Sequence, residues 1–78
     1  MPRVKYYDPS GRNAFVERLT ASHGEFSSVA EVGRIIGFKN YPRIYEWLRQ
    51  NNIPMCEILG RKMYDTAEIA KRLWEVMT

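Results

Sequence analysis

The chain has 78 residues, of which 45% are hydrophobic and 27% charged, and its formal net charge at pH 7 is +3. This length suits a single domain, 1–78, with one modest core, and it leaves little room for a deep catalytic cleft between domains. No stretch approaches the roughly 18 apolar residues of a membrane span, and no apolar run follows the basic start, so we expect a cytoplasmic protein with neither a secretory signal nor a membrane partner.

Side chains suited to catalysis or metal binding are few, with His23 as the single histidine and Cys56 as the single cysteine. One imidazole and one thiol do not assemble the usual zinc site, and a Ser-His-Asp triad would need remote residues to converge. Apolar neighbours favour Cys56 as a small strand residue over a nucleophile. His23, beside Gly24, is expected to be exposed or to compensate a helix dipole. We therefore predict no catalytic residue, metal or cofactor. Of three possible functions, catalysis is the one that the sequence supports least.

The first predicted helix begins at Asp8-Pro9-Ser10, where Asp8 is a suitable cap and Pro9 fits the first helical position. It ends near His23-Gly24, because glycine suits a left-handed C-terminal cap. Residues 1–26 are thus expected to form an N-terminal arm and an extra helix ahead of a core motif at 27–73. The apolar face of this helix is Ala14, Phe15 and Leu19, with Val16 as an optional fourth member.

A capping box at Ser28-Val29-Ala30-Glu31 starts the second predicted helix, because the serine hydroxyl and the glutamate carboxylate can each accept from the other residue's backbone amide. Gly37 ends this helix after about nine residues. Gly33 inside it costs about 1 kcal/mol relative to alanine, which predicts that another helix packs closely at that point. The apolar stripe is Val29, Val32, Ile35 and Ile36.

Asn40-Tyr41-Pro42 predicts the start of a third helix, 42–51, since asparagine caps well and proline is tolerated in the first turn. At about 100° per residue, Ile44, Trp47 and Leu48 fall on the core side. The outward face carries long side chains that can hydrogen-bond to base edges and phosphates, namely Arg43, Tyr45, Glu46, Arg49 and Gln50.

A β-hairpin is predicted after the third helix. Ile53-Pro54 imposes extended geometry before a strand at 55–59. Gly60-Arg61-Lys62 then reads as a turn and Met63-Tyr64 as the returning strand. We call this hairpin, 55–64, the wing, and we expect two cations at its tip.

The last predicted helix begins in a capping-box-like segment, Asp65-Thr66-Ala67-Glu68, and its buried stripe is Ile69, Leu73, Trp74 and Met77. The full order is α-α-α-β-β-α, mainly α with a small hairpin, which is the order of a winged helix-turn-helix. Segment 34–62, the basic segment, holds six basic residues against two acidic ones, whereas 1–33 is balanced and 63–78 has one excess negative charge. This clustering favours DNA binding over the alternative of an ordinary solvated face.

The pattern of a helix, Ile53-Pro54, a short strand, Gly60-Arg61-Lys62, an aromatic residue and a helix resembles the excisionase and MerR-type winged helix-turn-helix family. The likeness covers about 47 of the 78 residues, at 27–73. It implies a small nucleoid-associated DNA-binding factor of a phage, plasmid or other mobile element, which binds recombination sites or promoters and bends the DNA. It leaves open an integrase partner, a homo-oligomer on DNA, and whether the outcome is DNA recombination or transcription regulation.

By this likeness, the major-groove positions are Tyr41, Arg43, Tyr45, Glu46 and Arg49, and the cations that contact the backbone or minor groove are Arg61 and Lys62. The connection from Gly37 to Ile44 is one residue longer than the usual pattern. Lys39, Asn40 and Tyr41 therefore all remain candidates to lead into the groove. Glu46 lowers the affinity for a polyanion, and either accepts from cytosine or orients an arginine.

A reading from a different class is a protein-interaction module, such as a phage antirepressor-like domain or an adaptor, with no direct DNA role. It would present Tyr41, Tyr45 and Phe38 to another protein. In that case the arginines of the third helix form a solvated face that pairs with Glu46, and the basic hairpin only keeps its edge soluble.

Overall fold

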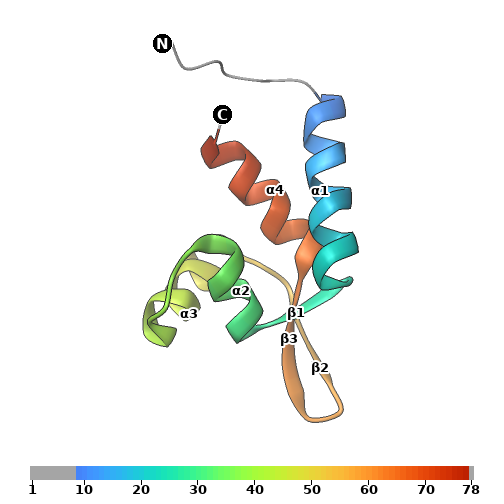
Figure 1. The fold of residues 1–78 in the computed structure, drawn as a ribbon. Helices are drawn as coiled ribbons and strands as arrows, with labels where there is room; N and C mark the ends of the chain where they lie inside the picture. Colours follow the sequence, from blue (N-terminus) through green and yellow to red (C-terminus); the bar gives the residue numbers. More distant parts are fainter. Residues whose placement is uncertain (1–8, 78) are drawn as a thin grey trace.

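The computed structural model describes residues 9–77, which form four helices and a three-stranded antiparallel sheet (Figure 1). The helices are α1 (Pro9–His23), α2 (Val29–Ile36), α3 (Tyr41–Gln50) and α4 (Thr66–Met77). The strands are β1 (Phe26–Ser28), β2 (Met55–Ile58) and β3 (Arg61–Asp65), in the sheet order β1-β3-β2. The predicted N-terminal arm lies outside the described residues, and so does Asp8, the expected cap of the first helix.

The observed order is α-β-α-α-β-β-α, so the expected order α-α-α-β-β-α is wrong by one strand, β1. Its sequence, Phe-Ser-Ser, has no alternating apolar pattern that would predict a strand. The strand forms because β3 offers a free edge, on which Ser27 pairs with Tyr64. The Ser27 hydroxyl lies 2.6 Å from the Thr66 hydroxyl, and both residues are fully buried. β1 also crosses the expected boundary at residue 26, and so joins the N-terminal helix to the core motif.

The helix α2 begins and ends as the sequence predicts. The Ser28 hydroxyl accepts from the Glu31 amide at 3.3 Å, and the Glu31 carboxylate accepts from the Ser28 amide at 3.5 Å. At the other end Gly37 has a φ of 82°, and its amide donates to the Gly33 carbonyl at 2.8 Å. The capping box and the left-handed glycine cap are both confirmed.

Gly33 lies at a close approach between α2 and Ile44 of α3. A β-carbon at this position would lie 2.7 Å from Ile44 Cδ1 and 2.7 Å from the Phe38 carbonyl oxygen. Ile44 and Leu48 are 1% and 3% exposed, and the half-buried Trp47 packs against the same core. The close helix packing and the core face predicted for α3 are therefore confirmed.

The turn of the wing differs from the prediction. Leu59 and Gly60 form the tip, with φ values of 52° and 79°, while Arg61 and Lys62 belong to β3 and pair with the last two residues of β2. Positive φ at both central residues is the signature of a type I′ turn. A turn of only two residues leaves both cations free to extend the β2–β3 ladder, which a Gly60-Arg61-Lys62 turn would not.

The helices α1 and α4 pack against each other, with the Phe15 and Trp74 rings 5.7 Å apart. Ile69 and Ala70 of α4 are fully buried. Ala14 is exposed, so its expected place on the apolar face is wrong; α1 presents only a narrow stripe because α4 is its main neighbour. Met77 is expected in the buried stripe of α4, but its side chain is not among those that the structure describes.

The start of α4 has half of the expected capping box. The Asp65 carboxylate accepts from the Glu68 amide at 3.2 Å. The Glu68 carboxylate turns instead to the Lys71 ammonium, at 3.3 Å. The helix therefore begins where the sequence predicts, with one of the two reciprocal hydrogen bonds.

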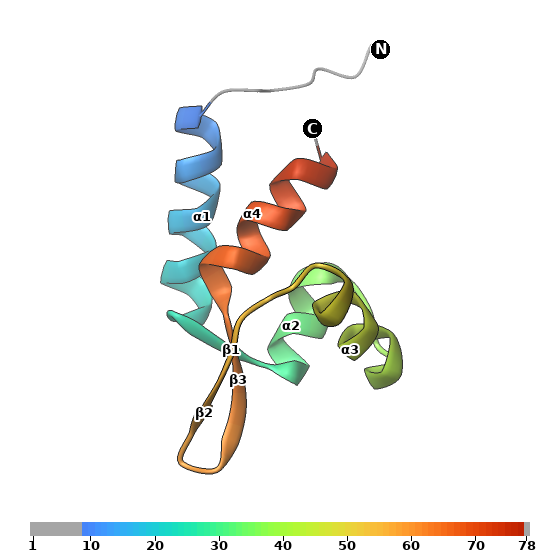
Figure 2. The same cartoon turned by 180° about the vertical axis from the view of Figure 1, so that it is seen from behind.

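The arrangement places two features at opposite ends of the sheet: α1 and α4 lie at one end, and the wing projects from the other (Figures 1 and 2). The pair α2 and α3 lies beside the sheet, between these ends. Within residues 9–77, none of the helices is long and apolar enough to cross a membrane. The core between the elements consists of Val32, Ile44, Leu48, Ile53, Tyr64 and Ile69.

Candidate nucleic-acid interface

The outward face of α3 is open to solvent, as the sequence predicts for Arg43, Tyr45, Glu46, Arg49 and Gln50. Tyr45 is 45% exposed. A shallow hollow of about 260 Å³ on this face is lined by Pro42, Tyr45, Glu46 and Arg49. Their common surface is rich in hydrogen-bonding groups and is not covered by another part of residues 9–77.

The cations of the basic segment take part in no ion pair within the described part of the chain. In α4, by contrast, Lys71 pairs with Glu68 at 3.3 Å and Arg72 with Glu75 at 3.6 Å. The excess charge of the basic segment is thus not neutralised internally and faces solvent. The six exposed side chains are Arg34, Lys39, Arg43, Arg49, Arg61 and Lys62.

Glu46, the acidic residue on this face, does not neutralise its arginines. Its carboxylate accepts from the Gln50 amide at 3.2 Å, one turn further along α3. The guanidinium of Arg43 lies over the Phe38 ring, 4.7 Å from the ring centroid. Stacking orients a guanidinium without using its N–H donors, so these donors stay available for a base edge or a phosphate.

Lys39, Asn40 and Tyr41 are the three residues predicted to lead into the DNA groove. They differ in their positions relative to the start of α3. Asn40 is the N-cap residue of α3 in extended conformation, and its side chain makes no capping hydrogen bond, so the expected side-chain cap is not formed. Tyr41 is the first helical residue and Gln50 the last, so the predicted bounds 42–51 are wrong by one residue at each end, whereas Lys39 belongs to the connection.

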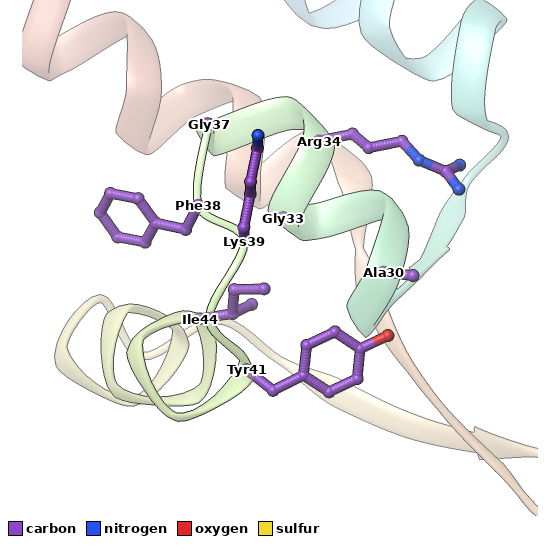
Figure 3. Close-up of a pocket in the computed structure, with 8 residues that line it drawn as sticks. All are labelled: Ala30, Gly33, Arg34, Gly37, Phe38, Lys39, Tyr41 and Ile44. Carbon is purple, nitrogen blue, oxygen red and sulfur yellow. The ribbon is translucent and has the colours of Figure 1, made fainter.

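Lys39 and Tyr41 line a groove of about 430 Å³ between α2 and the start of α3 (Figure 3). In this view Lys39 extends from the connection along α2, and the Tyr41 ring lies beneath Ala30. The structure thus places Lys39 and Tyr41 at this groove, apart from the predicted residues on the outward face of α3. The groove is lined by Ala30, Gly33, Arg34, Gly37, Phe38, Lys39, Tyr41 and Ile44.

The predicted wing cations lie on the returning strand. Arg61 pairs with Ile58 and Lys62 with Glu57. Successive strand residues point to opposite faces, so the two cations lie on opposite faces of the wing just behind its tip. The tip itself is Leu59, which is 99% exposed.

Tyr64, at the base of the wing, is affected electrostatically by Tyr45 of α3. Burial raises the pKa of Tyr64 above its ordinary value of 10.0, because a phenolate is poorly solvated there, and the nearby Tyr45 phenol raises it further. Tyr64 is only 7% exposed, whereas Tyr45 belongs to the outward face of α3. Tyr64 also belongs to the same core cluster as Ile44 and Leu48 of α3.

Two residues that were not predicted to contact DNA also lie on the surfaces described above, the groove and the wing. Arg34 contributes to the groove beside α2, and Leu59 forms the tip of the wing. Arg34 is visible in the sequence as part of the basic segment. The signal for Leu59 is the glycine that follows it, because a two-residue turn with Gly60 in second place puts Leu59 first.

The potential metal ligands are not clustered in the described range. No group of three or more His, Cys, Asp or Glu side chains within 9–77 could hold a metal ion. The half-buried His23 lies at the end of α1, with its Nδ1 3.4 Å from the Glu31 carboxylate of the α2 capping box. Cys56 is half-buried in β2.

Comparisons of the chain with protein-family models, with curated proteins and with solved structures find no match. The surface itself therefore carries the information about function. Its features are the open face of α3, the cations without internal partners and the projecting wing.

Proposed function

We propose that the chain is a sequence-specific double-stranded DNA-binding protein, of the excisionase and MerR-type winged helix-turn-helix kind, that serves a mobile element in recombination or transcription regulation. The observation that carries the proposal is the outward face of α3, which holds exposed arginines without an internal ion pair beside the base of the wing. The helix α3 enters the major groove, which is about 12 Å wide, and the wing lies along the backbone or in the minor groove.

The residues of the surface divide the work by their chemistry. Arg49 and Arg43 pair with guanine edges, because a guanidinium can donate two parallel hydrogen bonds to one base. Arg34 and Lys39, at the groove between α2 and α3, bind phosphates, which gives affinity without sequence information. Glu46 and Gln50 act as a hydrogen-bonded pair that presents an acceptor to cytosine or a donor to another base.

The test is selection of bound duplexes from random sequence at low salt, with the wild type, Arg49→Ala and Lys71→Gln. The wild type should enrich a short motif. Arg49→Ala should lose preference at one or two positions of that motif, since one bidentate contact discriminates by about 1–3 kcal/mol. Lys71→Gln is the matched control, because it also removes one positive charge but lies on α4, and it should enrich the wild-type motif. If the wild type enriched nothing and bound no duplex at low salt, the proposal would fall.

A second candidate is a protein-interaction module, such as an adaptor or an antirepressor-like domain. It is favoured by Tyr41 and Tyr45, which are 49% and 45% exposed on neighbouring surfaces. Tyrosine is enriched at the centres of protein interfaces. This function requires a protein partner whose binding survives high salt and is lost in Tyr45→Ala, together with no duplex binding by the wild type.

A further inference from the structure

The tip of the wing carries a side chain that is unfavourable for the isolated protein. Leu59 is 99% exposed, and its φ is 52°. A turn with positive φ at both central residues normally takes asparagine, aspartate or glycine first, because the β-carbon of other residues is crowded in this region. At this exposure, leucine gains no burial within the chain that would offset the strain. A contact outside the chain would bury this side chain and offset the strain.

The surroundings of Leu59 indicate the kind of contact. Ile58 beside it is 40% exposed, while Arg61 and Lys62 follow directly on β3, exposed and without an ion pair within residues 9–77. Binding to a protein or a lipid surface normally requires a broad apolar patch, and the end of a two-stranded hairpin is narrow. A narrow apolar tip, formed by Leu59 and its neighbour Ile58 with cations directly behind it, matches duplex DNA, which has an apolar base stack inside a shell of phosphates.

The wing is also long enough to act at a distance from α3. At its base, Tyr64 belongs to the same core cluster as Ile44 and Leu48 of α3. From Tyr64 to Arg61 the strand rises by about 10 Å, and Leu59 lies beyond that point. The tip therefore projects clear of the helix that reads the major groove, in the direction away from α1 and α4 (Figures 1 and 2).

We propose that Leu59 is a wedge: with α3 in the major groove, the leucine enters the neighbouring minor groove and inserts between two adjacent base pairs. Arg61 and Lys62 bind phosphates on either side of that step. Apolar side chains that insert in this way unstack the step and kink the duplex by roughly 20–90°. The inference rests on the proposed function and adds to it the residue that deforms the DNA.

The experiment compares the wild type with Leu59→Asn on duplexes recovered by selection from random sequence. Each duplex carries a donor and an acceptor dye at its ends, and in a second set a fluorescent adenine analogue replaces each adenine in turn. The wild type should shorten the distance between the dyes and brighten the analogue at one step. Leu59→Asn should lose both signals. Its affinity should change by less than about tenfold, because the cost of unstacking disappears together with the inserted side chain.

Asparagine suits this test because it tolerates positive φ, so the variant should unfold at a temperature at least as high as the wild type. Leu59→Met is the matched control: it keeps an apolar side chain and should keep both fluorescence signals. The inference is overturned if Leu59→Asn kinks and unstacks the duplex as the wild type does, or if the wild type binds duplexes without kinking them. Unchanged kinking by Leu59→Asn together with lost self-association would also overturn it and assign the tip to a second copy of the chain. A wild type that binds no duplex would instead refute the proposed function.

Discussion

Gly33 shows how a single missing side chain sets the distance between two helices. A β-carbon there would meet both Ile44 Cδ1 and the Phe38 carbonyl oxygen at 2.7 Å. We expect Gly33→Ala to destabilise the fold by about 1–3 kcal/mol in urea unfolding, since overpacking outweighs the better helix propensity of alanine. Ile44→Val removes one of the two clashing atoms, so adding it to Gly33→Ala should cost less than its own effect in the wild type. Strict additivity of the two changes would contradict the close packing.

Tyr64 gives the fold a dependence on alkaline pH. Its pKa is raised in the folded state, mainly by burial and secondarily by Tyr45, so folding favours the protonated phenol. The resulting stabilisation is complete below the ordinary pKa of 10.0 and is lost as the pH rises above it. We expect the free energy of unfolding to fall above about pH 10, measured by urea unfolding across this range. Tyr64→Phe should flatten this fall, and Tyr45→Phe should flatten it less, because burial is the larger cause.

Two kinds of element differ in how far local sequence determines them. The helix α2 carries its own start and stop signals, the Ser28–Glu31 capping box and Gly37, and both are present in the structure. The strand β1 has no such signal and exists because β3 offers a free edge. The wing lies between these cases: its strands follow from Ile53-Pro54 and the apolar residues after it, while its turn depends on which register the two strands adopt.

The hydroxyl pair between β1 and α4 tests the importance of that unpredicted strand. Ser27 and Thr66 are fully buried, with their hydroxyl oxygens 2.6 Å apart. Either Ser27→Ala or Thr66→Val should cost about 1–3 kcal/mol in urea unfolding, because it leaves the other hydroxyl buried without this partner. The double variant should cost clearly less than the sum. Ser22→Ala, at an exposed position of α1, is the control and should change little; a double variant as costly as the sum would contradict the pairing.

The distribution of charge over the whole molecule predicts how binding responds to salt. Four exposed cations are assigned to phosphates, namely Arg34, Lys39, Arg61 and Lys62. Each phosphate contact contributes about −0.9 to the slope of log K against log salt, so the four together should give a slope of about −3.6. Arg61→Ala should reduce its magnitude by about one and weaken all duplexes alike. Lys71→Gln should leave the slope unchanged, because α4 lies at the other end of the sheet from the wing (Figure 1). Equal effects of the two variants would contradict the assigned surface.

The sequence alone determined the helices, the core face of α3 and the basic segment, because helical periodicity, capping residues and charge are local properties of the chain. It also indicated the outward residues of α3, such as Arg49, since a helix that buries Ile44 and Leu48 must turn its other side to solvent. Only the tertiary structure decided that β1 joins the sheet, that Lys39 and Tyr41 line a separate groove, and that Leu59 replaces two cations at the tip of the wing. The pairing of β1 with β3 joins residues far apart in the chain. The groove and the tip of the wing depend on how α2 packs against α3 and on strand register, and neither leaves a repeating pattern in the sequence.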